Sequence, residues 1–350
     1  MWIEFVSVFF LAFVLSLFFT PRARKLALKF HIIEKSSPRK KHKRIITCVG
    51  GLAIYIAFII SLLFSFLFFP KILNPLFSSK VVGLLIGATI ILIMGLTDDI
   101  KEISGFTKVS LQIVAALVTS AIFDIKITYL ILPVLGKVSF GIFSIPFTIL
   151  WVVGLTNAIN WMDGLDGLAA GVSSIASLSF LFISLREGDY VTAILIVALV
   201  GATVGFLRYN FYPAKVFMGD TGSNFLGFML ANIAIVGSLK SAAVLSLAVP
   251  IIILGVPIFD TLFSVWRRTR LKKSPIKPDN DHFHHRLLKL GLGHRQAVLI
   301  IYAISGALSF CAIILDRSPN LTSLALVVFV IGIIGGIFWR LGLFSLSFRK

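Results

Sequence analysis

The sequence contains little cysteine. Cys48 and Cys311 are the two cysteines in 350 residues, and each lies in or at the edge of an apolar segment. Neither has a partner in a CxxC arrangement, so the sequence carries no CxxC redox or zinc motif. We interpret both as packing residues.

Acidic residues are also scarce, with 15 against 33 basic residues and a net charge of +18. The basic excess is concentrated: ten of the basic residues lie in 21–45 and nine in 266–296, whereas the alternate loops carry single, scattered lysines and arginines. The positive-inside rule then predicts that these two loops face the cytoplasm, with the N-terminus outside and the C-terminus inside. We therefore expect contact with anionic membrane lipids and not with nucleic acid.

Long polar stretches are missing, and 58% of the residues are hydrophobic. A soluble fold of this size could not bury so much apolar surface, whereas a membrane helix needs about 20 such residues. The sequence predicts an all-α polytopic membrane protein with about eleven transmembrane helices. The predicted spans are 2–20, 46–69, 80–97, 108–124, 141–157, 167–185, 190–207, 222–238, 242–264, 297–315 and 320–340. Because Trp2 and Glu4 stand where a basic region would precede a signal peptide, we interpret the first span as retained.

No long linker, internal repeat or low-complexity tract divides the chain. We therefore expect a single integral membrane domain over 1–350. Its predicted cytoplasmic loops are about 21–45, 98–107, 158–166, 208–221 and 265–296. Residues 125–145 depart from the helical pattern, because they are β-branched and aromatic with Pro133 and Gly136 between short runs. We predict a short external β-hairpin there.

Acidic residues gather where apolar runs meet the predicted cytoplasmic side. The three clusters are TDDIK at 97–101, NAINWMDGLDG at 157–167 and MGDTGS at 218–223. Each carboxylate alone could simply be solvated at a helix end. Adjacent carboxylates such as Asp98 and Asp99 repel, however, and several in one pocket need a cation between them. Oxygen ligands near phosphates predict Mg²⁺.

The spacing within the second cluster has a geometric meaning. Asn157, Asn160, Asp163 and Asp166 recur every third residue. Residues three apart are neighbours on a helix surface, and the series drifts by about 60° per step. The glycines in the cluster suit a helix end that approaches a ligand, or an ordinary helix contact. The third cluster suits either an anion-binding turn at a helix N-terminus or a plain N-cap.

Three of the six histidines lie in DHFHHR at 281–286. Structural zinc needs about four nitrogen or sulfur ligands, and no cysteine is close, so zinc is disfavoured. Donors from His282, His284, His285 and Arg286 fit a substrate phosphate better, and a solvated loop is the alternative.

The motifs together resemble the polyprenyl-phosphate N-acetylhexosamine-1-phosphate transferases over nearly the whole chain. The resemblance is carried by DDIK at 98–101, FTK at 106–108, NAINWMDGLDGLA at 157–169, VFMGDTGS at 216–223, PIFDT at 257–261 and HFHH at 282–285. The HFHHRLL form is most similar to the WecA/TagO branch. The phospho-MurNAc-pentapeptide branch usually has three consecutive histidines followed by Phe-Glu, which this chain lacks.

The resemblance implies a reaction at the inner face of the bacterial plasma membrane. Undecaprenyl phosphate attacks the β-phosphorus of UDP-N-acetylglucosamine or a similar UDP-sugar, UMP leaves, and Mg²⁺ (or Mn²⁺) is required. It also implies residue roles. The catalytic residues would be Asp98, Asp99, Asp163 and Asp220, and the metal ligands Asp220, Asp98, Asp99 and Asn160. Substrate would contact Lys108, Asn157, Asn160, Asp163, His282, His284, His285 and Arg286, with Asp166, Asn210 and Phe217 at the nucleobase. A homodimer is left open.

Three other classes of protein share some of these features. The first is a phospho-MurNAc-pentapeptide transferase, which the histidine pattern disfavours. The second is an ion-coupled transporter, whose carboxylates usually lie near the membrane midplane and whose halves often repeat. The third is a CDP-alcohol phosphotransferase, which the sequence excludes because no arginine follows Asp163 and Gly164 at the expected place.

Overall fold

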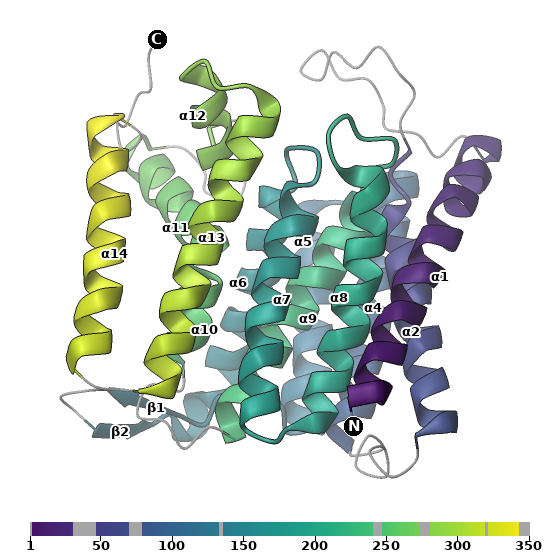
Figure 1. Ribbon diagram of the computed structural model, residues 1–350, viewed down its shortest axis with the longest axis horizontal. Helices are drawn as coiled ribbons and strands as arrows, with labels where there is room; N and C mark the ends of the chain where they lie inside the picture. Colours follow the sequence, from purple (N-terminus) through teal and green to yellow (C-terminus); the bar gives the residue numbers. More distant parts are fainter. Residues whose placement is uncertain are drawn as a thin grey trace.

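The computed structural model is a bundle of helices that run between two ends of the molecule (Figure 1). It describes residues 2–30, 47–69, 79–132, 136–240, 247–272, 281–318 and 321–342. The α-helices are α1 (Trp2–Lys29), α2 (Gly50–Phe68), α4 (Ser79–Lys101), α5 (Gly105–Leu117), α6 (Ser144–Met162), α7 (Leu168–Arg186), α8 (Tyr190–Asn210), α9 (Gly219–Lys240), α10 (Ala248–Ile253), α11 (Gly255–Arg270), α12 (Phe283–Lys289), α13 (His294–Arg317) and α14 (Leu321–Arg340). A π-helical stretch, Val118–Ile122, continues α5, and a 3₁₀ turn, Gly141–Phe143, precedes α6.

Eight helical segments of the described chain are long and apolar enough to cross a membrane. They are α1, α2, α4, α5 with its π-helical end, α6 with its 3₁₀ turn, α7, α8 and α13. The prediction of an all-α, multi-pass membrane protein is therefore confirmed. The count of eleven spans and the orientation of the N-terminus stay predictions, because length and composition do not decide them.

Helix α9 occupies the centre of the bundle. Its residues from Thr221 to Ile235 are all buried, and it packs against α2, α4, α6 and α7. In Figure 1 it lies behind α7 and α8. This central position places the first turn of α9, with Asp220, among the ends of several other helices.

The predicted hairpin is present. Strand β1 (Tyr129–Leu132) pairs antiparallel with β2 (Gly136–Ser139), and Tyr129 lies opposite Ser139. The hairpin lies at the same end of the bundle as the N-terminus and opposite α12 (Figure 1). Its predicted external location stays a prediction.

The predicted span over 242–264 is wrong as a single helix. Its described part is two helices, α10 and α11, which are separated at Leu254. Pro257 explains the break, because it has no N–H to continue the ladder toward residue 253 and fits instead into the first turn of a new helix. The start of the second helix at Gly255 places Asp260 on α11, near the end of the bundle that carries α12.

The segments between helices are shorter than predicted. Helix α1 continues through Pro21 to Lys29, where a loop was expected from residue 21. Asp98 and Asp99 lie on helix α4 and not in a loop, and Lys108 lies on α5, within its predicted span. Parts of the predicted loops 21–45 and 265–296, namely residues 31–45 and 273–280, lie outside the described residues.

Candidate active site

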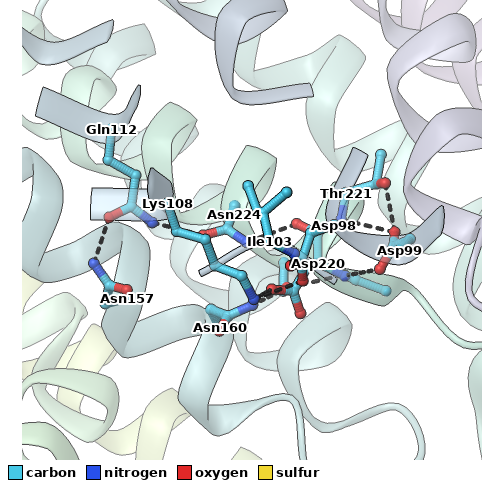
Figure 2. A network of polar contacts seen from close by, with 12 residues as sticks. Asp98, Asp99, Ile103, Lys108, Gln112, Asn157, Asn160, Asp220, Thr221 and Asn224 are labelled. Atoms are coloured by element: carbon cyan, nitrogen blue, oxygen red, sulfur yellow. Dashed lines mark hydrogen bonds and ion pairs between the residues drawn. The ribbon is translucent and has the colours of Figure 1, made fainter. Parts of the chain in front are cut away.

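Lys108 joins two of the acidic clusters (Figure 2). Its Nζ lies 2.6 Å from Oδ2 of Asp98 and 2.8 Å from Oδ2 of Asp220. The three side chains come from α4, α5 and α9. The two carboxylates would repel at this separation, and the ammonium between them removes that repulsion. Residues more than a hundred positions apart in the sequence therefore form one charged cluster, as the sequence predicted.

Asp99 faces the first turn of α9 (Figure 2). Its Oδ1 accepts from the backbone N–H of Asp220 at 2.8 Å, and its Oδ2 accepts from the backbone N–H of Thr221 at 3.1 Å and from the Thr221 hydroxyl. A carboxylate at a helix N-terminus satisfies free N–H groups and complements the helix dipole. Gly219 makes this approach possible, since its φ is +73° and a Cβ there would lie 2.5 Å from Oδ2 of Asp99.

Amide side chains connect α6 and α5 to the same helix (Figure 2). Asn157 Nδ2 donates to Gln112 Oε1 at 2.7 Å, Gln112 Nε2 donates to Asn224 Oδ1 at 3.0 Å, and Asn224 Nδ2 donates to the Asp220 carbonyl at 2.7 Å. Asn160 Nδ2 donates to Ser223 Oγ at 2.8 Å. Asn160 therefore contacts α9 directly, and Asn157 is linked to α9 through Gln112 of α5. Sequence reasoning missed Gln112, because a single glutamine in an apolar helix belongs to no motif.

The cluster suits a hard divalent cation. Asp98 and Asp220 offer carboxylate oxygens, and the Asn160 amide lies within hydrogen-bond reach of Asp220. Within the described residues no group of three or more histidine, cysteine or acidic side chains is arranged to hold a metal. Mg²⁺ is commonly held by one or two carboxylates together with substrate phosphates and water, so this donor set fits an ion that a phosphate completes.

The histidine cluster is anchored by Asp260, which the sequence analysis did not single out as a site residue. Asp260 Oδ2 lies 3.1 Å from His282 Nδ1, and its Oδ1 accepts from the backbone N–H of Phe283 at 2.7 Å. His284 Nε2 and His285 Nδ1 are buried with no hydrogen-bond partner among the described residues. Burial, followed by the charge of His285, lowers the pKa of His284 to about 3, and burial also lowers the pKa of His285. Both imidazoles are therefore neutral at neutral pH.

The end of α6 joins the two halves of the site. A Cβ on Gly164 would lie 2.3 Å from His284 Nε2, so the turn after α6 packs directly on this imidazole. The rings of Trp161 and His282 are 6.2 Å apart. Asn160, one position before Trp161, reaches α9. Asp163 ends α6 between these contacts and is half-buried.

Arg286 is buried beneath the histidines. Its Nη2 lies 2.8 Å from Asp281 Oδ2, which also lies 3.0 Å from Nη1 of Arg267 on α11. Lys289 Nζ lies 2.8 Å from the other oxygen of Asp281. This arrangement fastens α12 to α11. In the structure Arg286 pairs with Asp281, and its predicted contact with a substrate phosphate stays a prediction.

The three residues predicted for the nucleobase end lie close together. Asp166 Oδ2 accepts from the backbone N–H of Ala214 at 2.9 Å, and Asn210 Oδ1 accepts from the backbone N–H of Gly167 at 3.1 Å. Asn210 Nδ2 donates to the carbonyl of Val216, the residue before Phe217, at 3.0 Å. The turn 163–167 and the loop 211–218 are thereby held side by side.

An apolar cavity of about 270 Å³ lies between α10, α11, α13 and α14. Phe283, which stands between His282 and His284, contributes to its wall. Other lining residues are Ile251, Phe259, Leu262, Leu308 and Phe338. The cavity therefore begins beside the histidine cluster and is suited to hydrocarbon.

Comparison with known proteins defines the class. Residues 81–238, which include Asp98, Lys108, the 157–167 cluster and Asp220, match glycosyl transferase family 4. A "Probable undecaprenyl-phosphate N-acetylglucosaminyl 1-phosphate transferase" of Bacillus subtilis (strain 168) is 39% identical over 94% of this chain and 90% of its own length. The chain belongs to the polyprenyl-phosphate N-acetylhexosamine-1-phosphate transferase family, and it is a membrane phosphotransferase.

Other relatives differ in coverage. A "Decaprenyl-phosphate N-acetylglucosaminephosphotransferase" of Mycolicibacterium smegmatis is 35% identical over 88% of this chain and 81% of its own length. A "Phospho-N-acetylmuramoyl-pentapeptide-transferase" of Clostridium botulinum (strain Eklund 17B / Type B) is 34% identical, but over only 55% of this chain and 61% of its own length. The likeness to the N-acetylglucosamine-phosphate branch thus extends through the region that carries the histidines.

Proposed function

We propose that this protein transfers N-acetylglucosamine-1-phosphate from UDP-N-acetylglucosamine to undecaprenyl phosphate at the cytoplasmic face of the bacterial inner membrane. The products are UMP and undecaprenyl-diphosphate-N-acetylglucosamine, the first lipid-linked intermediate of a cell-surface glycan. The observation that carries this proposal is the Lys108 ammonium held between Asp98 and Asp220 at one end of a membrane bundle. The names of the full-length relatives support the choice of both substrates.

The chemistry explains why such a cluster is useful. An oxygen of the lipid phosphate attacks the β-phosphorus of the donor. The bond from this phosphorus to the bridging oxygen breaks, and its electron pair leaves with UMP. Both reactants are anionic, so they repel each other. Mg²⁺, when bound, would neutralise the diphosphate and stabilise the charge that develops on UMP.

The residues of this chain have separate tasks in the proposal. Asp98, Asp220 and Asn160 would hold the ion, and Lys108 would contact a phosphate oxygen. A phosphate monoester has a second pKa near 6, so the attacking group is largely ionised at pH 7 and needs no strong base. The buried, neutral His284 and His285 would offer N–H donors to the sugar or its phosphate.

The apolar cavity beside Phe283 supports a lipid acceptor. A polyprenyl chain needs an apolar path that ends near the phosphate site, and the wall of this cavity adjoins the histidine cluster. Such a chain is already in the hydrocarbon of the bilayer, so it can enter an apolar cavity without being exposed to water. The chain of the acceptor would therefore lie among α11, α13 and α14, while its phosphate reaches toward α6.

A defined assay tests this function. Purified protein should release UMP from UDP-N-acetylglucosamine only when Mg²⁺ and undecaprenyl phosphate are both present. Asp220→Asn should lower turnover by at least about a hundredfold, because one charged ligand is lost in a low-dielectric site. Asp124→Asn is a matched control, since Asp124 is exposed at the hairpin end. Full activity of Asp220→Asn, or transfer without a divalent ion, would contradict the metal role.

The same UMP assay decides donor identity, and a flux measurement in liposomes decides the rival class. A panel of UDP-acetamido sugars, with UDP-MurNAc-pentapeptide included, reports the preferred donor. Efficient use of the pentapeptide donor alone would contradict the choice of N-acetylglucosamine. Proton or Na⁺ flux into liposomes without any UMP release would support the transporter alternative instead.

A further inference from the structure

Helix α13 holds the turn 163–167 in place, although none of its residues belongs to a recognised motif. The backbone N–H of Asp166 donates to Nε2 of His294, the first residue of α13, at 2.9 Å. About two helical turns further along, the hydroxyl of Tyr302 donates to the carbonyl of Gly167. The turn is thus fixed from α13 at two neighbouring residues.

The contact from His294 satisfies a backbone N–H of the turn that has no partner within a helix, and the contact from Tyr302 adds a donor to a carbonyl that also accepts from Gly171 in α7. Residues 163–167 lie between α6 and α7, so their N–H and C=O groups need bonds from elsewhere. His294 accepts from the N–H of Asp166, and Asn210 accepts from the N–H of Gly167. The Tyr302 hydroxyl adds a second donor to the Gly167 carbonyl, and the N–H of Ala214 donates to the Asp166 carboxylate from the loop side. The fit of Tyr302 is close, because a Cβ on Gly171 would lie 1.9 Å from its hydroxyl oxygen.

The side of the turn that His294 supports faces water. The His294 ring stacks on Tyr212, with ring centroids 4.7 Å apart, and Tyr212 is 41% exposed. Gly164, Pro213 and Lys215 nearby are also exposed. The apolar cavity, in contrast, is lined by α10, α11, α13, α14 and Phe283, and by no residue of the turn 163–167. The exposed side of the turn at His294 therefore suits a water-soluble nucleotide sugar, whereas the apolar cavity suits a lipid chain.

We propose that His294 and Tyr302 are positioning residues that set the turn 163–167 for the soluble nucleotide-sugar donor and leave the lipid acceptor unaffected. This inference rests on the proposed function. It requires Nε2 of His294 to be a hydrogen-bond acceptor, so that its ring proton is on Nδ1. The hydrogen-bond acceptor Nε2 of His294, and not the aromatic ring itself, is then the feature that binding of the nucleotide sugar needs.

Two substitutions separate the role of the hydrogen-bond acceptor Nε2 from the role of the aromatic ring of His294. His294→Phe keeps an aromatic ring against Tyr212 and removes the acceptor, whereas His294→Gln keeps an acceptor at a similar distance from the backbone and removes the ring. We expect His294→Phe to raise KM for UDP-N-acetylglucosamine about tenfold, the effect of one lost hydrogen bond. KM for undecaprenyl phosphate should not change, and His294→Gln should restore most of the donor affinity.

Tyr302→Phe should change the donor KM in the same direction. Tyr190→Phe, near the opposite end of the bundle, is its matched control. Equal changes in both KM values, a loss of folded protein without a donor-specific change, or no rescue by glutamine would overturn the inference.

Binding of UDP, measured by calorimetry, keeps the test separate from the proposed function. His294→Phe should bind UDP more weakly than wild type, and His294→Gln should bind it nearly as well. Wild-type protein that binds UDP but transfers no sugar would contradict the proposed function, and the comparison of variants would still judge His294. Absence of UDP binding by wild type would overturn both.

Discussion

His284 is a neutral histidine in the folded protein, and this has a consequence for stability. Its pKa in the folded state is about 3, mainly because it is buried, against about 6.5 for an exposed histidine. Between these values the unfolded chain takes up a proton that the folded chain does not. The contribution to stability is therefore fully present above pH 6.5 and is lost as pH falls toward 3.

Replacement of His284 by asparagine should flatten this dependence. Wild-type protein should lose about 2 kcal/mol between pH 6.5 and pH 5 from this residue. His284→Asn should lose correspondingly less over the same interval. Thermal unfolding in detergent at several pH values measures the difference. Parallel curves for the two proteins would show that His284 does not titrate as its burial implies.

Gln112 is an uncharged residue whose hydrogen bonds also stabilise the folded protein. It is 1% exposed and bonds to Asn157 and Asn224 at once. Gln112→Leu would remove one hydrogen bond from each of two buried amides, at a cost of about 0.5–1.5 kcal/mol each. We expect a lower unfolding temperature and a lower turnover. The neighbouring Leu111→Met, a volume-conserving change, is the control, and an unchanged Gln112→Leu protein would contradict the role of the amide chain.

The residues that sequence reasoning found and those it missed differ in one respect. Asp98, Asn160 and Asp220 stand in clusters where apolar runs end, and such clusters are visible in a single sequence. Gln112, Asp260 and Tyr302 are isolated polar residues within helices, and only the packing of those helices shows their partners. The roles of neighbouring residues were also not predictable: Asp98 and Asp99 are adjacent, yet they face different groups.

Helix α4 acts as the cap of α9, and this separates the tasks of its two aspartates. Asp99→Asn keeps an acceptor for one N–H of α9 and loses the charge at the helix N-terminus, which should cost about 1–2 kcal/mol. Asp98→Asn should cost little stability and most of the turnover. Unfolding temperature and UMP release, measured on both variants, give the comparison. If Asp99→Asn lost turnover as fully as Asp98→Asn at unchanged stability, Asp99 would be a direct ligand.

Helices were predicted better than their interruptions. The apolar runs showed where most helices lie, because a run of about 20 apolar residues has few other solutions in a membrane. The break at Leu254 was not predicted, since the residues on both sides of it are apolar and hydropathy does not register a change of helix. Pro250 and Pro257 were the available signals.

The whole molecule has two chemically different ends. The acidic cluster, the turn 163–167 and the histidines gather at the end where α12 lies, and the hairpin and the N-terminus lie at the other (Figure 1). Cysteine labelling tests this arrangement in a background with Cys48→Ser and Cys311→Ser. Lys137→Cys on the hairpin should react with a membrane-impermeant maleimide on whole cells, and Leu290→Cys, after α12, only in inverted vesicles. Reaction of both from one side would contradict the proposed topology.

The ammonium of Lys108 has two counter-ions and occupies the space between them. In a poorly hydrated site, such an ammonium leaves its two carboxylate partners only when another anion takes their place. The phosphate of an arriving substrate is an anion of this kind. When substrate binds, Lys108 would then move from the two aspartates to the phosphate, and the aspartates would become free to bind a divalent ion. A resting enzyme would therefore hold magnesium weakly until its substrate is present.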